Sequence, residues 1–403
     1  MHILVLNSGS SSIKFSLYDM TRETLLVSGS LERIGEANGS GIFHKYGDAG
    51  HVEEYTEELP ADNHAAGLVQ LFAFLENNNL VDAKQSLHAI GHRVVHGGET
   101  FQSPTMIDDG VVDAIREMIP LAPLHNPANL DGIVAARRLY PHIPQVAVFD
   151  TTFFRSLPPH AYHYALPDEL YRQHHVRRYG FHGTSHQYVA RQAADYLQQP
   201  LEKLKLITLH LGNGASTAAI LNGLCIDTSM GMTPLEGLIM GTRCGDLDPS
   251  LHFYLARTVG MDLDEIETLL NLDSGLKGLC GASDMRDVHR LADNGDEQAR
   301  LAIEIYCYRI AKYIGAYYAA LGGLDALIFT AGIGENDPAI RQSICNRLSV
   351  LGITLDHERN QSCTGSNCDI SEKSSKVKVV VVATNEELEI ARQTLLINSN
   401  STS

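Results

Sequence analysis

Two stretches of this sequence share one pattern, although they begin about 200 residues apart. Residues 3–19 read ILVLNSGSSSIKFSLYD, and residues 206–223 read LITLHLGNGASTAAILNG. Each has an apolar run, a small polar turn, and a second apolar run that ends in polar residues, which predicts a β-hairpin. The repetition favours a duplicated fold with two facing lobes and a ligand in the cleft between them. Chance similarity of two hairpins is the alternative.

Strand-like and helix-like segments alternate along the chain, which indicates an α/β protein. Further strands are expected in residues 87–98, 145–153, 324–336 and 377–384, and helices in 63–79, 109–119, 127–139, 296–321, from 338 onward and in 385–396. Another helix follows YGFHGTSH (179–186), capped by Thr184 or Ser185, and Asn126 is expected to cap the helix at 127–139. Residues 361–376 are expected to form an exposed loop, and 398–403 a loose tail.

Composition narrows the function. A chain of 403 residues suggests two or three domains. The net charge of −17 disfavours nucleic acid and anionic membrane as partners, so an anionic substrate would need a local group of cations. The start lacks signal-peptide features, and no apolar run is long enough to span a membrane. Seven scattered cysteines are typical of reduced thiols in a cytoplasmic protein, and the nearby Cys363 and Cys368 lack a second pair for a zinc site.

Three glycine or serine turns follow apolar runs, at residues 8–12, 212–216 and 332–336. Exposed backbone N–H groups in such turns bind phosphate oxygens, although any single glycine is more often present for its backbone conformation. None of the three fits the GxxxxGK[ST] pattern of a P-loop or a clear GxGxxG. Together with Lys14, the turns indicate a site for a nucleotide.

Charged residues at strand ends supply the other candidates. Arg93 is expected after a strand, with His92 and His96 beside it, and Arg243 in a glycine-rich loop; their guanidinium groups can bind carboxylate or phosphate. His182 and His186 have the i, i+4 spacing of zinc ligands, but without the glutamate of HExxH a phosphoryl-donor role for His182 is the better interpretation. Asp150 and Glu386 follow buried strands, a typical position for Mg²⁺ ligands; stabilisation of a helix start is the alternative for the glutamate and for its neighbour Glu387.

Long motifs identify a family. The sequences NSGSSSIKFSL, GHRVVHGGE, PLAPLHNPANL, VFDTTFF, RRYGFHGTSH, HLGNGAS, DTSMGMTPLEGLIMGTR, FTAGIGEN and TNEELEIAR together resemble the acetate kinase family, in order and spacing. That family belongs to the sugar kinase, Hsp70 and actin superfamily. The resemblance implies two duplicated ribonuclease-H-like lobes: an N-terminal lobe of residues 1–150 plus 385–403, and a nucleotide-binding lobe of residues 151–384. It further implies a cytoplasmic homodimer that transfers phosphoryl reversibly and in line between ATP and acetate, giving acetyl phosphate and ADP.

The resemblance also assigns site residues. It implies catalytic roles for Arg93, Asp150, His182 and Arg243, and acetate binding by Arg93, Val95, Leu124, Phe181 and Pro234. It implies nucleotide binding by Ser10, Ser12, Lys14, His210, Leu211, Gly212, Asn213, Gly214, Asp284, Met285, Arg286, Gly332, Ile333, Gly334, Glu335 and Asn336. It places Mg²⁺, or Mn²⁺ as an alternative, at Asn7 and Glu386. Because acetate is already ionised at neutral pH, we expect Asp150 to orient the metal rather than remove a proton.

Two departures and two alternatives accompany the resemblance. Met285 replaces an aromatic or other apolar residue and is expected to alter only the adenine wall, whereas Cys244 replaces a serine beside Arg243 and is expected to make activity sensitive to oxidation.

Valine at position 95 favours acetate over propionate, yet one methylene discriminates by only about 1–3 kcal/mol, so a propionate or other short-chain acyl kinase stays open. A nucleotide-driven binding protein of the Hsp70 or actin type is the alternative from another class.

Overall fold

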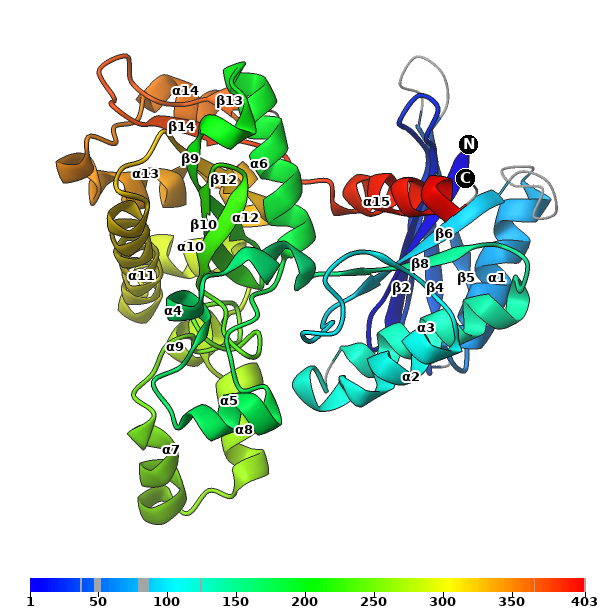
Figure 1. The fold of residues 1–403 in the computed structure, drawn as a ribbon. Helices are drawn as coiled ribbons and strands as arrows, with labels where there is room; N and C mark the ends of the chain where they lie inside the picture. Colours follow the sequence, from blue (N-terminus) through cyan, green and yellow to red (C-terminus); the bar gives the residue numbers. More distant parts are fainter. Residues whose placement is uncertain (37, 47–51, 79–86, 124, 366, 402–403) are drawn as a thin grey trace. The chain divides into compact units, whose positions relative to one another are not determined.

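The computed structural model describes residues 1–36, 38–46, 52–78, 87–123, 125–365 and 367–401. The chain forms two compact units, which Figure 1 colours along the sequence. Unit 1 is Met1–Thr152 together with Asn385–Ser403, and unit 2 is Phe153–Thr384. Because the end of the chain returns to unit 1, unit 2 is an insertion between two parts of it.

Unit 1 is built on a mixed sheet. Its strands are β1 (His2–Ser8), β2 (Ser12–Asp19), β3 (Thr24–Glu32), β4 (Ser40–Tyr46), β5 (Val52–Glu58), β6 (Leu87–Val94), β7 (Thr105–Met106) and β8 (Gln145–Phe149). Its helices are α1 (His64–Asn77), α2 (Asp109–Glu117), α3 (Asn126–Leu139) and α15 (Glu386–Ser401), with a 3-10 turn, η2 (Ile119–Leu121), and another, η3 (Thr152–Ser156), at the junction with unit 2. The strand order is β5-β4-β3-β2-β1-β6-β8-β7.

Both faces of this sheet are covered, and the sequence explains why. In β1, Leu4 and Leu6 join the apolar cluster formed with α1 and α3. The opposite face is covered by α15, since a Cβ on Gly91 of β6 would meet the side chains of Ile390 and Thr394. Side chains alternate between the two faces of a strand, so a strand buried on both faces is apolar throughout, as ILVL is.

Unit 2 repeats the plan. Its strands are β9 (Lys205–Leu211), β10 (Ala215–Leu221), β11 (Leu224–Thr228), β12 (Ala326–Thr330), β13 (Cys368–Asp369) and β14 (Lys378–Val381), in the order β11-β10-β9-β12-β14-β13. Its helices are α4 (Pro159–Tyr162), α5 (Asp168–His174), α6 (Gly183–Leu197), α7 (Ser250–Tyr254), α8 (Leu263–Leu272), α9 (Gly275–Cys280), α10 (Met285–Asp293), α11 (Glu297–Leu321), α12 (Ala331–Asn336), α13 (Pro338–Asn346) and α14 (His357–Ser362). Short turns are η4 (Leu201–Lys203), a π turn η5 (Leu255–Val259) and η6 (Ser349–Leu351). Helices α6 and α11 lie on opposite sides of the sheet (Figure 1).

The two sheets share a topology. In unit 1, β1, β2 and β3 pair antiparallel, β6 and β8 extend the sheet in parallel with β1, and β7 closes it antiparallel. In unit 2, β9, β10 and β11 pair antiparallel, β12 and β14 follow in parallel with β9, and β13 closes it antiparallel. The duplicated α/β fold expected from the two hairpins is therefore confirmed, with β4 and β5 added to unit 1.

Several local expectations are wrong. The helix at 127–139 begins at Asn126, with His125 as its N-cap residue and no capping side chain. Helix α6 begins at Gly183, so neither Thr184 nor Ser185 caps it; the N-cap is His182. The last helix continues through Ser401, which removes most of the expected loose tail. Typical N-cap residues are Ser, Thr, Asp or Asn with an extended backbone, whereas His182 has a left-handed backbone with φ of 58°. Residue type therefore did not identify this cap.

The stretch 361–376 also differs from expectation. Cys363 and Cys368 form a disulfide, so these two cysteines are not the free thiols that the spacing favoured. The segment adds β13 to the sheet and buries Ile370 and Ser371, so it is not simply an exposed loop. Within the described ranges, no helix combines the length and hydropathy that a membrane span requires.

Candidate active-site groups in the two units

Unit 1 gathers its predicted groups where β1, β6 and β8 end and α15 begins. The carboxyl ends of parallel strands meet at one edge of a sheet, so Asn7, Arg93 and Asp150 become neighbours there. Arg93 Nη2 donates to Asp150 Oδ2 at 2.6 Å, and its Nε lies 3.2 Å from both carboxylate oxygens of Asp150. Arg93 Nη1 lies 3.5 Å from Asn7 Oδ1, and Nε lies 4.0 Å from Glu386 Oε2. One guanidinium thus joins three oxygen-bearing side chains.

The ion pair at Arg93 is largely withdrawn from water. The side chain of Asp150 is 1% exposed and that of Arg93 is 20% exposed. Burial by itself would lower the pKa of the Arg93 guanidinium, but the carboxylates of Asp150 and Glu386 outweigh burial and hold that pKa above its ordinary value. Arg93 is therefore a fixed cation, and its fork geometry orients the Asp150 carboxylate.

The start of α15 places a second carboxylate in this cluster. Asn385 Oδ1 accepts a hydrogen bond from the Leu388 N–H at 2.9 Å, which caps the helix and directs Glu386 toward Arg93. Burial is the largest cause of a raised Glu386 pKa; with Asp150 and Glu387 also raising it and Arg93 and Lys14 lowering it, the pKa of Glu386 is about 7. Lys14 pairs with Asn7 across the β1–β2 hairpin and is exposed. At this edge the carboxylates of Asp150 and Glu387 and the cations Arg93 and Lys14 therefore all act on Glu386.

The raised pKa of Glu386 gives a stability prediction. An acid whose pKa is higher in the folded state, here about 7 against an ordinary 4.5, binds more protons when folded. Stability is therefore highest below the ordinary pKa and falls as pH rises through this window. In EDTA, Glu386→Gln should stabilise the protein above pH 7 by on the order of 2 kcal/mol, with the difference shrinking toward pH 4.5.

Denaturant unfolding at stepped pH measures this effect, and Glu57→Gln on the exposed strand β5 is the matched control. A Glu386→Gln minus wild-type difference that does not change between pH 4.5 and 8 would contradict the assignment.

Unit 2 gathers histidines and hydroxyl groups at the corresponding edge of its sheet. His182 Nδ1 lies 2.9 Å from Ser216 Oγ, and its ring stacks on His210 with centroids 4.2 Å apart. His210 Nδ1 lies 2.8 Å from Ser185 Oγ, which joins α6 to the end of β9. His186, one turn after His182, lies with its ring nitrogens at Thr208 and Ser216 rather than at a metal site.

Arg243 lies beside the 212–214 turn. Gly241 N–H donates to Asn213 O at 2.9 Å, and a Cβ on Gly241 would clash with the Asn213 side chain, so the loop that carries Arg243 packs closely on the turn. A Cβ on Gly214 would lie 3.4 Å from His182 Nε2 and 3.8 Å from Arg243 Nη1. The two nitrogens therefore face one space that the glycine leaves open.

The guanidinium of Arg243 has no acidic partner among the described residues. Its Nη1 donates to Pro234 O at 3.3 Å and lies 3.7 Å from Met240 Sδ. Burial lowers the pKa of Arg243, and no carboxylate opposes that shift. A half-buried cation without a counter-ion, in a protein with a net charge of −17, indicates a place for an external anion.

The other predicted residues are distributed over both units. Val95 is buried in unit 1 and its N–H donates to Asn129 Oδ1, whereas Phe181 is buried in unit 2. Leu124 lies outside the described residues. Asp284 caps α10 and pairs with the exposed Arg286, and Met285 between them is buried.

Glu335 in the third glycine turn is engaged within the protein. Its Oε1 accepts hydrogen bonds from Ala331 N–H at 2.8 Å and Thr384 N–H at 3.0 Å. Ala331 has φ of 64°, so this turn is held in a left-handed conformation by the Glu335 carboxylate. The backbone N–H groups at the start of this turn are the part that could contact a ligand.

A buried arginine that the sequence did not reveal supports the same turn. Arg341 is completely buried and donates to Gly334 O, Glu335 O, Asn360 O, Asn360 Oδ1 and Cys363 O, all between 2.8 and 3.0 Å. Burial lowers the pKa of Arg341 to about 10. Four backbone oxygens and one side-chain amide oxygen thus take the place of a carboxylate as its partners.

Replacing Arg341 should destabilise unit 2. Arg341→Met leaves several buried carbonyl oxygens without donors, for an expected loss of about 3 kcal/mol or more of unfolding free energy. The control Arg347→Met removes an arginine that is one-third exposed and 3.6 Å from Glu304, with an expected cost below about 1 kcal/mol. Denaturant unfolding compares the two variants, and equal costs would contradict a supporting role for Arg341.

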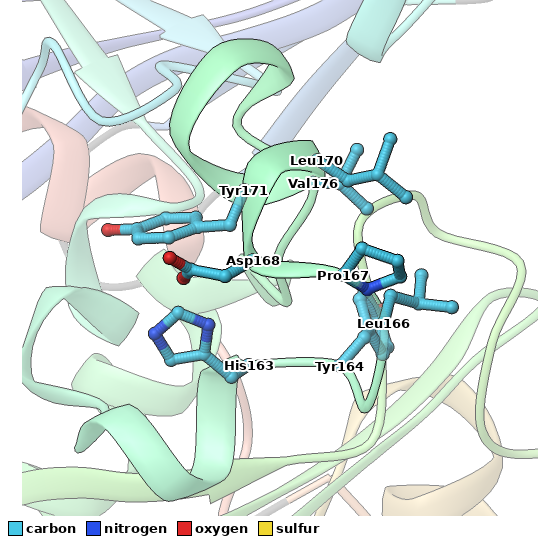
Figure 2. Close-up of a pocket in the computed structure, with 8 residues that line it drawn as sticks. All are labelled: His163, Tyr164, Leu166, Pro167, Asp168, Leu170, Tyr171 and Val176. Carbon is cyan, nitrogen blue, oxygen red and sulfur yellow. The ribbon is translucent and has the colours of Figure 1, made fainter.

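One cavity lies apart from all of these residues. In unit 2 a cavity of about 320 Å³ is lined by His163, Tyr164, Leu166, Pro167, Asp168, Leu170, Tyr171 and Val176. Figure 2 shows His163, Asp168 and Tyr171 on one side and the aliphatic residues on the other. Tyr164 OH donates to Glu236 Oε2 at 2.6 Å, and Arg178 donates to Glu236 Oε1, so this wall braces the loop that carries Pro234. None of the predicted site residues lines the cavity.

The two matching sheets are those of the actin-like kinase fold, and an arginine without an acidic partner among the described residues suits a small anionic acceptor. The sequence pattern of the acetokinase family matches residues 2–392. The chain belongs to the acetokinase family, whose members are kinases that transfer a phosphoryl group to a carboxylate.

Relatives cover nearly the full length. The acetate kinase of Syntrophobacter fumaroxidans is 53% identical over 396 residues, covering 98% of this chain and 96% of that protein. The acetate kinase of Thermotoga maritima is 52% identical, covering 98% of each chain. The crystal structure of Porphyromonas gingivalis acetate kinase matches with a TM-score of 0.91 and 43% identity, covering 98% and 99%. A propionate kinase from Francisella tularensis matches with a TM-score of 0.91, 44% identity and the same coverage. The acceptor acid is therefore the point to test.

Proposed function

We propose that this protein is an acetate kinase, which transfers the terminal phosphoryl group of ATP reversibly and directly to acetate, giving acetyl phosphate and ADP. The observation that carries this proposal is the Arg243 guanidinium, which has no acidic partner among the described residues and faces the same space as His182 Nε2 beside Gly214. A cation and a hydrogen-bond donor next to a glycine turn suit a phosphoryl group in transfer, whose charge lies on its equatorial oxygens.

The proposed roles follow from these environments. Arg93 and Arg243 hold the carboxylate and the transferring phosphoryl, and His182 donates a hydrogen bond to that phosphoryl. The backbone of residues 210–214 and 332–336, with Ser10, Ser12 and Lys14, contacts the nucleotide phosphates or adenosine, as do Asp284 and Arg286. Acetate titrates near pH ~4, so it is already ionised and requires no general base. Asp150, fixed by Arg93, therefore orients a metal or its bound water.

The residues of unit 1 fit Mg²⁺. Asn7, Asp150 and Glu386 each direct an oxygen atom at one guanidinium. Mg²⁺ prefers oxygen ligands and uses few from protein when substrate phosphates supply the rest, and Mn²⁺ is the alternative. Burial, together with the neighbouring carboxylates, raises the pKa of Glu386, and a bound cation would lower it. When bound, the metal would neutralise charge on the phosphates. Among the described residues, no three His, Cys, Asp or Glu side chains form a metal cluster, so the nucleotide is expected to complete the coordination.

We also propose that the protein is a cytoplasmic homodimer. Unit 2 carries an exposed group of apolar residues on and around α7, namely Leu251, Phe253, Tyr254, Val259 and Leu263, each 39% or more exposed. Exposed apolar groups of this kind commonly mark protein contacts. Sedimentation equilibrium of the wild type tests the dimer, and a monomer at micromolar concentration would exclude it.

Trapping with hydroxylamine tests the function. Acyl phosphate formed from ATP and a carboxylic acid is converted to a hydroxamate, so signal should depend on acetate and metal. A series of acids distinguishes acetate from propionate; with Val95, Phe181 and Pro234 lining the acid site, propionate should react more slowly by about 10–200-fold. A preference for propionate would favour the short-chain acyl kinase alternative. Absence of acyl phosphate with every acid would favour a nucleotide-driven binding protein.

A further inference from the structure

A buried chain of hydrogen bonds ends at His182. Thr208 Oγ1 lies 2.7 Å from His186 Nδ1, His186 Nε2 lies 2.8 Å from Ser216 Oγ, and Ser216 Oγ lies 2.9 Å from His182 Nδ1. Thr208, His186 and Ser216 are all completely buried. Their positions on β9, α6 and β10 bring them together only in the folded unit 2. The remaining ring nitrogen of His182, Nε2, is the one that faces the space beside Gly214.

The direction of these hydrogen bonds is decided at Thr208. In the described part of the chain, Thr208 Oγ1 has no hydrogen-bond partner except His186. A buried hydroxyl that only accepted would leave its proton without a partner, which costs more than leaving a lone pair of the oxygen unused. Thr208 O–H therefore donates to His186 Nδ1.

The directions of the other two hydrogen bonds follow from counting protons. Burial holds the pKa of His186 well below its ordinary value, so its ring is neutral and carries one proton. With Nδ1 accepting, that proton is on Nε2 and is donated to Ser216 Oγ. Ser216 has a single proton, which it must then donate to His182 Nδ1. A neutral His182 whose Nδ1 accepts carries its proton on Nε2.

We propose that Thr208, His186 and Ser216 are positioning residues that fix His182 in the tautomer with the proton on Nε2, so that a neutral imidazole presents a hydrogen-bond donor to the transferring phosphoryl group. The functional part of this inference rests on the acetate kinase proposal; the tautomer itself does not. The reverse direction would leave Nε2 as a bare acceptor facing phosphate oxygens, which would repel them.

The tautomer is measured on the substrate-free wild type by two-bond ¹H–¹⁵N NMR of the full chain labelled with ¹⁵N-histidine, with His182→Gln to assign the signal. A protonated Nε2 and an unprotonated Nδ1 are expected for His182. A protonated Nδ1 in the neutral ring overturns the proposal. Because this measurement needs no turnover, it stands even if the protein forms no acetyl phosphate, an outcome that would instead overturn the proposed function.

Thr208→Val tests the remote end of the chain. It removes the terminal donor, three hydrogen bonds from His182, so the tautomers should mix and kcat for acetyl phosphate formation should fall about tenfold, the effect of roughly one neutral hydrogen bond, with KM for ATP unchanged. Thr208→Ser keeps the donor and should keep the wild-type NMR signature.

The matched control is Thr217→Val, on the neighbouring strand β10. Thr217 is also completely buried, and its Oγ1 has no hydrogen-bond partner among the described residues, so its tautomer signal and kcat should be those of wild type. If Thr208→Val fails to fold, Ser216→Ala provides the same readouts at the near end. Unchanged tautomer and kcat in whichever of these two variants folds would overturn the proposal.

Discussion

Replacing Arg243 by alanine is expected to lower kcat/KM for acetate phosphorylation by about 10²–10³-fold or more, while unit 2 stays folded. The guanidinium faces the space beside Gly214 and has no carboxylate partner among the described residues, so its removal breaks no ion pair. Charged donors aimed at the transition state in a water-poor site are among the largest single contributions to catalysis. Steady-state kinetics measures the loss, and thermal unfolding checks the fold.

Two comparisons sharpen this experiment. Added guanidinium should restore part of the activity of Arg243→Ala, because a free cation can occupy the emptied position. Arg290→Ala is the matched control, since Arg290 is exposed and pairs with Asp287 one turn away. Wild-type activity in Arg243→Ala, or an equal loss in Arg290→Ala, would refute the assignment.

The second large effect is expected at Asp150. Asp150→Asn should raise the Mg²⁺ concentration needed for half-maximal activity by about tenfold or more, because an amide is a weaker ligand for a hard cation than a carboxylate. Saturating Mg²⁺ should recover much of kcat, since acetate needs no base. Titration of activity with Mg²⁺ at constant ATP gives the result. Turnover lost at saturating Mg²⁺, with metal affinity intact and a shifted pH optimum, would instead assign a proton-transfer role.

Asp150→Ala measures what the Arg93–Asp150 ion pair contributes to stability, apart from its effect on metal binding. Asp150 is the main partner of the largely buried Arg93, and removing one partner of such an ion pair typically costs about 3–5 kcal/mol. The alanine variant should therefore lose stability as well as activity, whereas the asparagine variant still offers Arg93 an acceptor oxygen. Equal stability of the two variants would show that the ion pair does not support unit 1.

Much of the fold could be predicted because the pattern and the contacts are local. The runs that flank the turns at residues 8–12 and 212–216 form hairpins, and their parallel neighbours β6, β8, β12 and β14 follow from short apolar segments. The ends of parallel strands meet, so Asn7, Arg93 and Asp150 could be expected at one edge. The cap of α6 could not, because the left-handed conformation of His182 is imposed by its surroundings and not by its residue type.

The residues whose roles the sequence did not reveal could be recognised only from strand register and burial. Ser216 pairs with His210 across β9 and β10, a register that places its hydroxyl between two histidines, yet serine in an apolar strand gives no such signal. The i, i+4 spacing of His182 and His186 was visible in the sequence, but its use in a hydrogen-bond chain was not. In the sequence, Arg341 looks like a surface arginine on a helix. Its five acceptor oxygens are apparent only in the structure.

Cys244 shows how burial changes a chemical expectation. Its position beside Arg243 suggested sensitivity to oxidation, but burial raises the pKa of the Cys244 thiol to about 11. The thiolate is the reactive form, so this thiol should react slowly near neutral pH. The structure therefore does not favour Cys244 as an oxidation-sensitive site.

The insertion of unit 2 within unit 1 has a consequence for biosynthesis. A ribosome makes all of Phe153–Thr384 before it makes α15, the helix that covers one face of the unit 1 sheet. During that interval the apolar face around Val5 and Gly91 has no α15 to cover it, although the hairpins of the same sheet are already complete. Nascent chains arrested before residue 386 should therefore bind chaperones through this face, and release should follow synthesis of the final helix.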